Sequence, residues 1–166
     1  MTITSGSLVG PYEIVAPIGR GAMGEVWRAR DARLGRDVAI KALPEELRRD
    51  PERRSRFERE ARVLAALNHP NVGAIYGLEE QDGSTYLVLE LVEGETLAEK
   101  LLSGPLPIAD ALSVAVQVAA GLEAAHDADI VHRDLKPANV KVRPDGSVKI
   151  LDLGLARVSD PKSEPA

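Results

Sequence analysis

The sequence predicts an α+β fold, and three features of its pattern indicate it. One helix with a single apolar stripe follows Asp50, and a second, long helix is expected at 107–127. The long helix is apolar on nearly every side between Ala111 and Ala125. Segments rich in β-branched and aromatic residues favour strands at 12–18, 25–30, 37–43, 72–77 and 85–90.

The amino-acid composition limits which partners the protein can bind and which kinds of metal or disulfide site it can contain. The 166 residues carry 21 Lys and Arg against 26 Asp and Glu, a net charge of −5 that argues against nucleic acid as a partner. The sequence has no cysteine, which excludes a disulfide framework and a thiolate zinc site. No secretory signal and no uninterrupted apolar run of membrane-spanning length are visible. We therefore expect a cytoplasmic location and no membrane segment in this chain.

A glycine-rich segment joins the first two expected strands, after small, polar residues at 1–10 that we expect to be flexible. Three glycines within 19–24 would let the backbone close over a ligand and point N–H groups at phosphate oxygens. A dinucleotide-binding turn would need a helix next, whereas residues 25–30 favour a strand. We therefore predict a flap between two strands.

A lysine in the third expected strand and a glutamate in the following helix are predicted to pair. The strand at 37–43 alternates, so Lys41 shares a face with Ala39. A lysine in such a position commonly extends its ammonium to water. Glu60, however, lies on the apolar stripe of the helix, and an unpaired buried carboxylate is costly. The stripe consists of Phe57, Ala61, Leu64 and Leu67.

Two apolar runs flank Asp145-Gly146, a dipeptide that predicts a two-residue hairpin turn. Folding about that turn would set Asn139 opposite Asp152, with Asp134 and Lys136 just upstream. Amide and carboxylate oxygens suit a magnesium ion that keeps water and takes phosphate oxygens from a substrate. The alternative interpretation is a polar hairpin end with solvated charges.

Two motifs in this region resemble those of a known family. His132-Arg133-Asp134-Leu135-Lys136 through Asn139, followed by Asp152-Leu153-Gly154, resembles the catalytic loop and metal-binding motif of eukaryotic-type Ser/Thr protein kinases. The resemblance extends from Tyr12 to Arg157. It implies a protein-kinase-like fold with a complete five-stranded small lobe, one main helix and the first part of a helical large lobe. It also implies a division into a flexible N-terminus (1–10), an ATP-binding small lobe (11–90), the hinge and start of the large lobe (91–157) and a truncated activation segment (158–166).

The activity that the resemblance implies is transfer of the γ-phosphoryl group of ATP to a Ser or Thr hydroxyl of a protein, with Mg²⁺. The implied catalytic residues are Asp134, Lys136, Lys41 and Glu60, and the implied metal ligands are Asn139 and Asp152. The implied nucleotide-binding residues are Ile18, Gly19, Arg20, Gly21, Ala22, Met23, Gly24, Val26, Ala39, Lys41, Leu89, Glu90, Val92 and Lys141. Among these, the Glu90 C=O and the Val92 N–H would bind the adenine edge.

Two positions depart from the family pattern. Lys141 stands where an apolar residue usually touches the underside of adenine, so its alkyl stem must substitute. Leu153 stands where phenylalanine is usual, and we expect it to join an apolar column. The other members of that column would be His132, Leu64 and Ile75.

Two classes of function stay open at this point. The chain is either the amino-terminal portion of an active Ser/Thr protein kinase or an inert truncated kinase fragment that only binds nucleotide or another protein. The apolar helix at 111–125 lacks a covering layer within the sequence, so a missing segment or a partner is expected to cover it. The substrate protein is unknown from the sequence.

Overall fold

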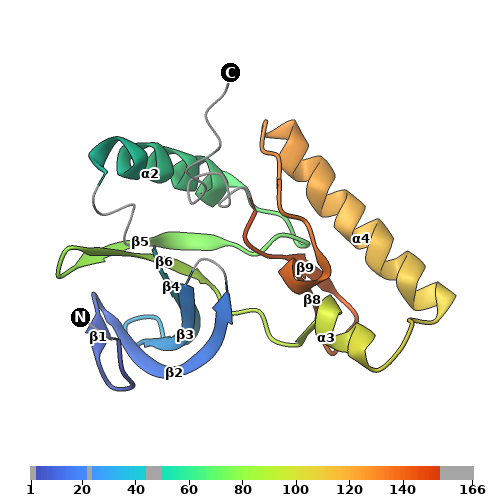
Figure 1. The fold of residues 1–166 in the computed structure, drawn as a ribbon, viewed down its shortest axis with the longest axis horizontal. Coiled ribbons are helices and arrows are strands. Elements are labelled where there is room, and N and C mark those ends of the chain that lie inside the picture. Colours follow the sequence, from blue (N-terminus) through green and yellow to red (C-terminus); the bar gives the residue numbers. More distant parts are fainter. Residues whose placement is uncertain (1–2, 22–23, 44–49, 154–166) are drawn as a thin grey trace. The chain divides into compact units, whose positions relative to one another are not determined.

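The computed structural model describes residues 3–21, 24–43 and 50–153 (Figure 1). The chain divides into two compact units. Unit 1 comprises Met1–Arg59 and Ile75–Leu91, and unit 2 comprises Glu60–Ala74 and Val92–Ala166. The mixed strand and helix content confirms the α+β class that the sequence predicts.

Unit 1 contains a six-stranded antiparallel sheet in the order β1-β2-β3-β4-β6-β5. Each of the five predicted strands has a counterpart in this sheet, and a short sixth strand, β1, extends its edge. The bounds are β1 Leu8–Val9, β2 Tyr12–Gly21, β3 Gly24–Asp31, β4 Arg36–Ala42, β5 Ile75–Gln81 and β6 Ser84–Glu90.

Strand β1 differs from the expectation that residues 1–10 are flexible. Val9 is buried in the core of unit 1, and the Gly6 N–H donates to the Ile14 carbonyl at 2.8 Å. The Gln81 side chain ties this edge to β5, because its amide donates to the Leu8 carbonyl at 2.8 Å and its oxygen accepts from the Gly10 N–H at 2.9 Å. These contacts join residues about seventy positions apart, which local sequence pattern does not register.

The turn between β5 and β6 explains why β5 continues to Gln81, beyond the predicted end at residue 77. Asp82 and Gly83 have φ angles of 51° and 70°, which are the left-handed values of a two-residue type I′ turn. Gln81 therefore pairs with Ser84, and both belong to strands. Val72 instead forms an isolated parallel bridge with Ile150 in unit 2.

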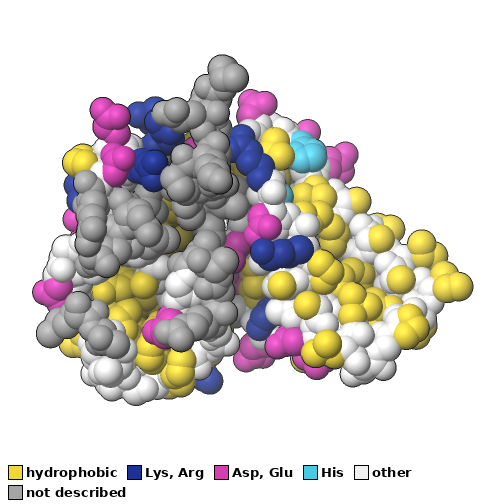
Figure 2. All heavy atoms as spheres, viewed as in Figure 1, with side chains coloured by type: hydrophobic (Ala, Val, Ile, Leu, Met, Phe, Trp, Pro, Cys, Tyr) yellow, Lys and Arg dark blue, Asp and Glu magenta, His cyan; other side chains and the backbone are white. Residues whose placement is uncertain are grey.

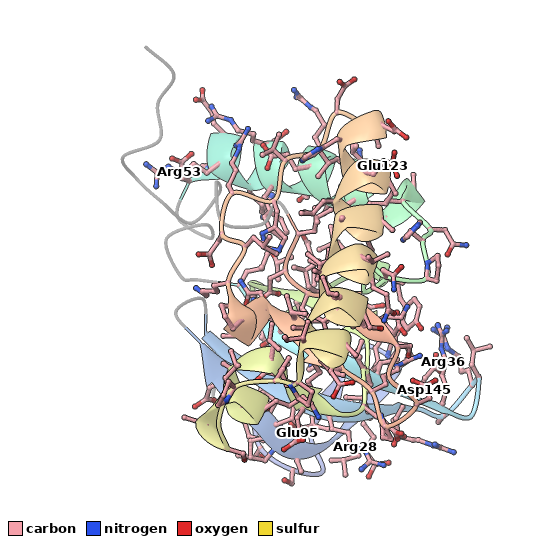
Figure 3. All side chains as sticks on the ribbon, turned by 90° about the vertical axis from the view of Figure 1, so that its right-hand side faces the viewer. Arg28, Arg36, Arg53, Glu95, Glu123 and Asp145 are labelled. Carbon is pink, nitrogen blue, oxygen red and sulfur yellow. The ribbon has the colours of Figure 1, made fainter. Side chains whose placement is uncertain are left out.

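The helix α2, Pro51–Ala66, begins where the sequence predicts. The Asp50 carboxylate caps it by accepting from the N–H groups of Glu52 at 3.0 Å and Arg53 at 3.1 Å; Figure 3 labels Arg53 at this end of the helix. Phe57, Ala61 and Leu64 are buried, as the predicted stripe requires, and Leu67 and Glu60 are half-buried.

Unit 2 contains a three-stranded sheet in the order β7-β8-β9 and two helices, in addition to the last part of α2 (Figures 1 and 3). Val140, Val142 and Val148 form a core that Leu97, Val114 and Val118 cover from the helices. The bounds are β7 Glu95–Thr96, α3 Leu97–Leu102, α4 Ile108–Asp127, the 3-10 turn η1 Pro137–Asn139, β8 Val140–Val142 and β9 Val148–Ile150.

The long helix α4 leaves most of its apolar surface exposed, and Figure 2 shows hydrophobic side chains gathered along it. Only Gly121 and Ala125 of this helix are buried, whereas Val116 is 68% exposed. The helix α4 is long and apolar enough to cross a membrane by length and composition alone. The expectation that this chain contains no membrane segment stays a prediction. The finding is weak evidence, because the core helix of a soluble protein passes the same test.

Candidate active site

His132 anchors the loop that carries the predicted catalytic residues. Its side chain is 2% exposed, its Nε2 lies 3.0 Å from the Leu151 carbonyl oxygen, and its Nδ1 accepts from the Asp134 N–H at 3.3 Å. These partners fit the neutral tautomer with its proton on Nε2. The following residue, Arg133, has a φ of 65°, a conformation that is costly for a non-glycine residue and is held by its surroundings.

The Asp134 carboxylate is held by two neighbours of the same loop. Lys136 Nζ donates to Asp134 Oδ2 at 2.7 Å, and Asn139 Nδ2 lies 3.2 Å from the same oxygen. The Asn139 amide also donates to the Asp134 carbonyl at 2.8 Å. The hydrogen bond from Lys136 lowers the pKa of Asp134, and Asn139 contributes in the same direction. The carboxylate is therefore ionised and oriented, while 45% of its side-chain surface stays exposed.

Replacing Lys136 with methionine is expected to raise the pKa of Asp134 towards the ordinary aspartate value. The ammonium stabilises the charged carboxylate, so its removal lets protonation begin at a higher pH. A carboxyl-carbon NMR titration of Asp134 measures the shift directly. Lys100→Met is the matched control, because Lys100 pairs with Glu95 and not with this loop. An Asp134 pKa that does not change in Lys136→Met would contradict the assignment.

The hairpin register differs from the sequence prediction by one residue. The loop between β8 and β9 contains Pro144, Asp145 and Gly146, because the Arg143 N–H pairs with the Ser147 carbonyl at 2.8 Å. Proline favours the second position of a type I turn, and Gly146 follows with a φ of 82°. The strands consequently pair Val140 with Ile150.

This register places the two predicted metal ligands next to each other in the strand ladder but not directly opposite. The Leu151 N–H donates to the Asn139 carbonyl at 2.8 Å, so Leu151 faces Asn139 and Asp152 follows one residue later. The prediction that Asn139 lies opposite Asp152 was therefore wrong by one position. Both residues still lie at the open end of the hairpin, beside the loop that carries Asp134.

The chemistry of these two side chains fits a magnesium ion. Asn139 uses its NH₂ group on Asp134, and its Oδ1 makes no hydrogen bond to any residue that the structure describes. Asp152 is half-buried and has a φ of 56°, which aspartate tolerates better than most residues. Within residues 3–21, 24–43 and 50–153, no group of three His, Cys, Asp or Glu could hold a metal. An ion here would complete its shell with water and phosphate oxygens, as Mg²⁺ does.

Asn71 and Gln117 connect β9 with α4 and support the hairpin. The Asn71 side-chain amide donates to the Val148 carbonyl at 2.9 Å and to Gln117 Oε1 at 3.1 Å. Gln117 Oε1 accepts from the Val148 N–H at 2.9 Å, and its Nε2 donates to the Gly146 carbonyl at 3.0 Å. Gln117 is a polar residue in a largely apolar helix, and its contacts give it a function in fixing the hairpin.

Four of the predicted nucleotide-binding residues share one face of the sheet in unit 1. Val26 pairs with Lys41 and Ala39 pairs with Leu89, and paired residues point to the same side. Lys41 is only 5% exposed and participates in an interaction of its own. The opposite face carries the core cluster, which includes Val38 and Ile40. The predicted alternation of the strand is thus confirmed.

The glycine-rich segment is a strand-to-strand connection, as predicted. β2 ends at Gly21 and β3 begins at Gly24, with Gly19 paired to Val26. Gly24 has a φ of 116°, and a Cβ there would lie 3.1 Å from the Ala42 carbonyl oxygen, so glycine is required. Ile18 is 49% exposed. Ala22 and Met23 lie outside the described residues, as does the side chain of Arg20.

The remaining predicted residues lie at the end of β6 and in unit 2. Glu90 is the last residue of β6, and Val92 is buried, with its carbonyl accepting from Lys141 Nζ at 3.0 Å. That contact was not predicted. Lys41 and Glu60 belong to different units, so their ion pair stays a prediction. The apolar column expected around Leu153 also stays a prediction, because its members belong to different units. His132, Leu64 and Leu153 are buried in unit 2, and Ile75 belongs to unit 1.

One unit holds an antiparallel sheet with a glycine flap and a buried lysine, and the other holds an Asp–Lys–Asn loop. This combination is typical of proteins that position a nucleotide for phosphoryl transfer. A family model described as "Protein kinase domain" matches residues 12–165. The chain belongs to the protein kinase family.

Named relatives agree with this family. The chain is 46% identical over 155 residues to a "Probable serine/threonine-protein kinase SCO3848" of Streptomyces coelicolor, with 90% of this chain and 23% of the relative covered. It is 44% identical over 160 residues to the "Serine/threonine-protein kinase PknA" of Mycobacterium tuberculosis, with 93% and 37% covered. The chain thus spans well under half the length of these curated relatives.

A solved structure agrees as well. The crystal structure of the Mycobacterium tuberculosis PknI kinase domain superimposes with a TM-score of 0.83 at 30% sequence identity. The alignment covers 93% of this chain and 64% of that chain. The protein-kinase-like fold predicted from the motifs is confirmed.

Proposed function

We propose that the protein transfers the γ-phosphoryl group of ATP to Ser or Thr hydroxyls of a protein, with Mg²⁺ as the metal. The observation that carries this proposal is the Asp134 carboxylate, which Lys136 and Asn139 orient while it stays open to solvent. Because ATP is the proposed substrate, we propose a cytoplasmic location with it. The relatives named as serine/threonine-protein kinases support the same class of reaction.

Each charged or amide side chain of the candidate site has a function in this proposal. Asp134 accepts the proton of the attacking hydroxyl or orients that hydroxyl, since its lowered pKa keeps it in the acceptor form. Lys136 offsets negative charge on the transferred group, and Lys41 holds the other phosphates. Asn139 Oδ1 and the Asp152 carboxylate would hold Mg²⁺, which supplies positive charge against the developing phosphoryl oxygens.

A second candidate function rests on the exposed face of α4. Ile108, Leu112 and Val116 are 79%, 62% and 68% exposed, and exposed apolar patches commonly mark surfaces that another segment or protein covers. Under this alternative the chain binds nucleotide or another protein without transferring phosphate.

Phosphate transfer from radiolabelled ATP to casein separates the two candidates. We expect labelled phosphoserine or phosphothreonine that depends on Mg²⁺ and on the 166-residue chain. Background labelling only, together with a thermal shift on adding ATP and Mg²⁺, would favour a binding module. Background labelling with no thermal shift would leave only the protein-interaction function.

A further inference from the structure

Lys141 occupies an unusual position for a charged side chain and makes a specific contact there. It lies in the middle of β8, half-buried, and pairs with Thr96 of β7. Its Nζ donates to the carbonyl oxygen of Val92 at 3.0 Å, and Val92 is 4% exposed. A hydrogen bond from a charged donor to a buried carbonyl is among the stronger kinds in proteins. The ammonium is therefore held in place by this carbonyl.

The Glu99 carboxylate, in the first turn of α3, also favours this position of the Lys141 ammonium group. Glu99 accepts from the Thr96 N–H at 2.6 Å and from the Thr96 hydroxyl at 2.8 Å, which closes the capping box of α3. The Thr96 hydrogen bonds mainly lower the pKa of Glu99, and the Lys141 charge adds to the effect. The ammonium thus lies within the field of a fixed negative charge, while its alkyl stem remains in β8.

The occupied carbonyl has a consequence for the purine that the protein can bind. This step rests on the proposed function and on the kinase resemblance, which implies that the Glu90 C=O and the Val92 N–H bind the adenine edge. The C=O can accept from the 6-amino group of adenine, and the N–H can donate to N1. On the purine ring, position 2 is the next atom after N1. On the backbone, the Val92 carbonyl is the next hydrogen-bonding group after the Val92 N–H, so the two sequences of atoms run side by side. A substituent at purine position 2 would therefore face the carbonyl that Lys141 already holds.

We propose that Lys141 is a positioning residue that selects 6-aminopurine nucleotides without a 2-amino group. A 2-amino group would bring its own N–H donors to the Val92 carbonyl, where the ammonium already donates. Two positively polarised donors repel each other, so the 2-aminopurine loses both a partner and favourable electrostatics. Adenine carries only a C–H at this position and avoids the conflict.

The test compares binding of ATP and 2-aminoadenosine triphosphate to the full chain by calorimetry. Wild type is expected to prefer ATP, and Lys141→Met is expected to shift the ratio of the two dissociation constants about tenfold towards the 2-amino nucleotide, the scale of one charge-assisted hydrogen bond. Lys141→Arg retains a charged donor and is expected to keep the wild-type preference. A merely structural function would lower both affinities together and leave the ratio unchanged.

Lys149→Met is the matched control. Lys149 pairs with Lys141 across the hairpin and donates to the Val72 carbonyl at 3.2 Å, which lies away from the Glu90–Val92 segment in the sequence. Its replacement is expected to leave the nucleotide ratio unchanged. An unchanged ratio in Lys141→Met, or a relaxed ratio in Lys141→Arg, would overturn the inference. If wild type binds neither nucleotide, the proposed function fails first, and the inference fails with it.

Discussion

Replacing Asp134 with asparagine is expected to lower kcat by about 10²–10⁴-fold, the usual contribution of a positioned general base. Asparagine has nearly the same shape, but its side chain cannot accept a proton from the attacking hydroxyl. The hydrogen bond from Lys136 keeps the native carboxylate ionised, so the wild-type chain loses nothing to protonation near neutral pH. Steady-state phosphate transfer to casein at saturating ATP measures the loss, and calorimetry checks that ATP still binds.

Asp129→Asn provides the control for this change. Asp129 is exposed and has a φ of 59°, a conformation that asparagine adopts readily, so the substitution alters charge without straining the backbone. Its kcat should equal that of the wild-type chain. A kcat for Asp134→Asn equal to that of Asp129→Asn would reject Asp134 as the group that handles the proton.

Replacing Asp152 with asparagine is expected to lower kcat by about 10²–10³-fold and to raise the Mg²⁺ concentration needed for half-maximal rate. The substitution replaces the negatively charged carboxylate with a neutral amide, so only partly negative oxygens remain to hold the ion. Because asparagine tolerates the φ of 56° at this position, the backbone should not change. A magnesium titration of the phosphate-transfer rate at fixed ATP measures both effects.

Asp145→Asn tests whether any loss is specific to the metal position. Asp145 lies in the turn at the other end of the same hairpin, where its carboxylate accepts from the Ser147 N–H at 2.9 Å and from the Ser147 hydroxyl at 2.6 Å (Figure 3). This control should retain the wild-type magnesium dependence. Equal magnesium dependence in Asp152→Asn and wild type would show that Asp152 does not bind the ion.

Most of the elements follow from local pattern, and the structure bears this out for particular residues. The alternation around Lys41 follows from the period of a strand, and the cap at Asp50 follows from the unsatisfied N–H groups of a helix start. The length and apolar character of α4 also follow from its residues alone. Each of these features depends on neighbours within a few positions, so the sequence contains the needed information.

The remaining features depend on contacts between distant segments. Gln81 holds β1 against β5, and Asn71 with Gln117 holds β9 against α4. No local pattern distinguishes these amides from ordinary exposed ones, because their partners lie elsewhere in the chain. The contact of Lys141 with the Val92 carbonyl belongs to the same group, since about fifty residues separate the two.

The sequence by itself determined which side chains the candidate site contains: Asp134, Lys136, Asn139 and Asp152 all appear in the order that the kinase motifs require. Only the tertiary structure decided how they meet. The three-residue loop at 144–146 shifted the hairpin by one position, because proline cannot donate a ladder hydrogen bond and Gly146 supplied a left-handed residue. Residue identity is encoded in the chain, whereas register is the outcome of competition among turns, strands and distant hydrogen bonds.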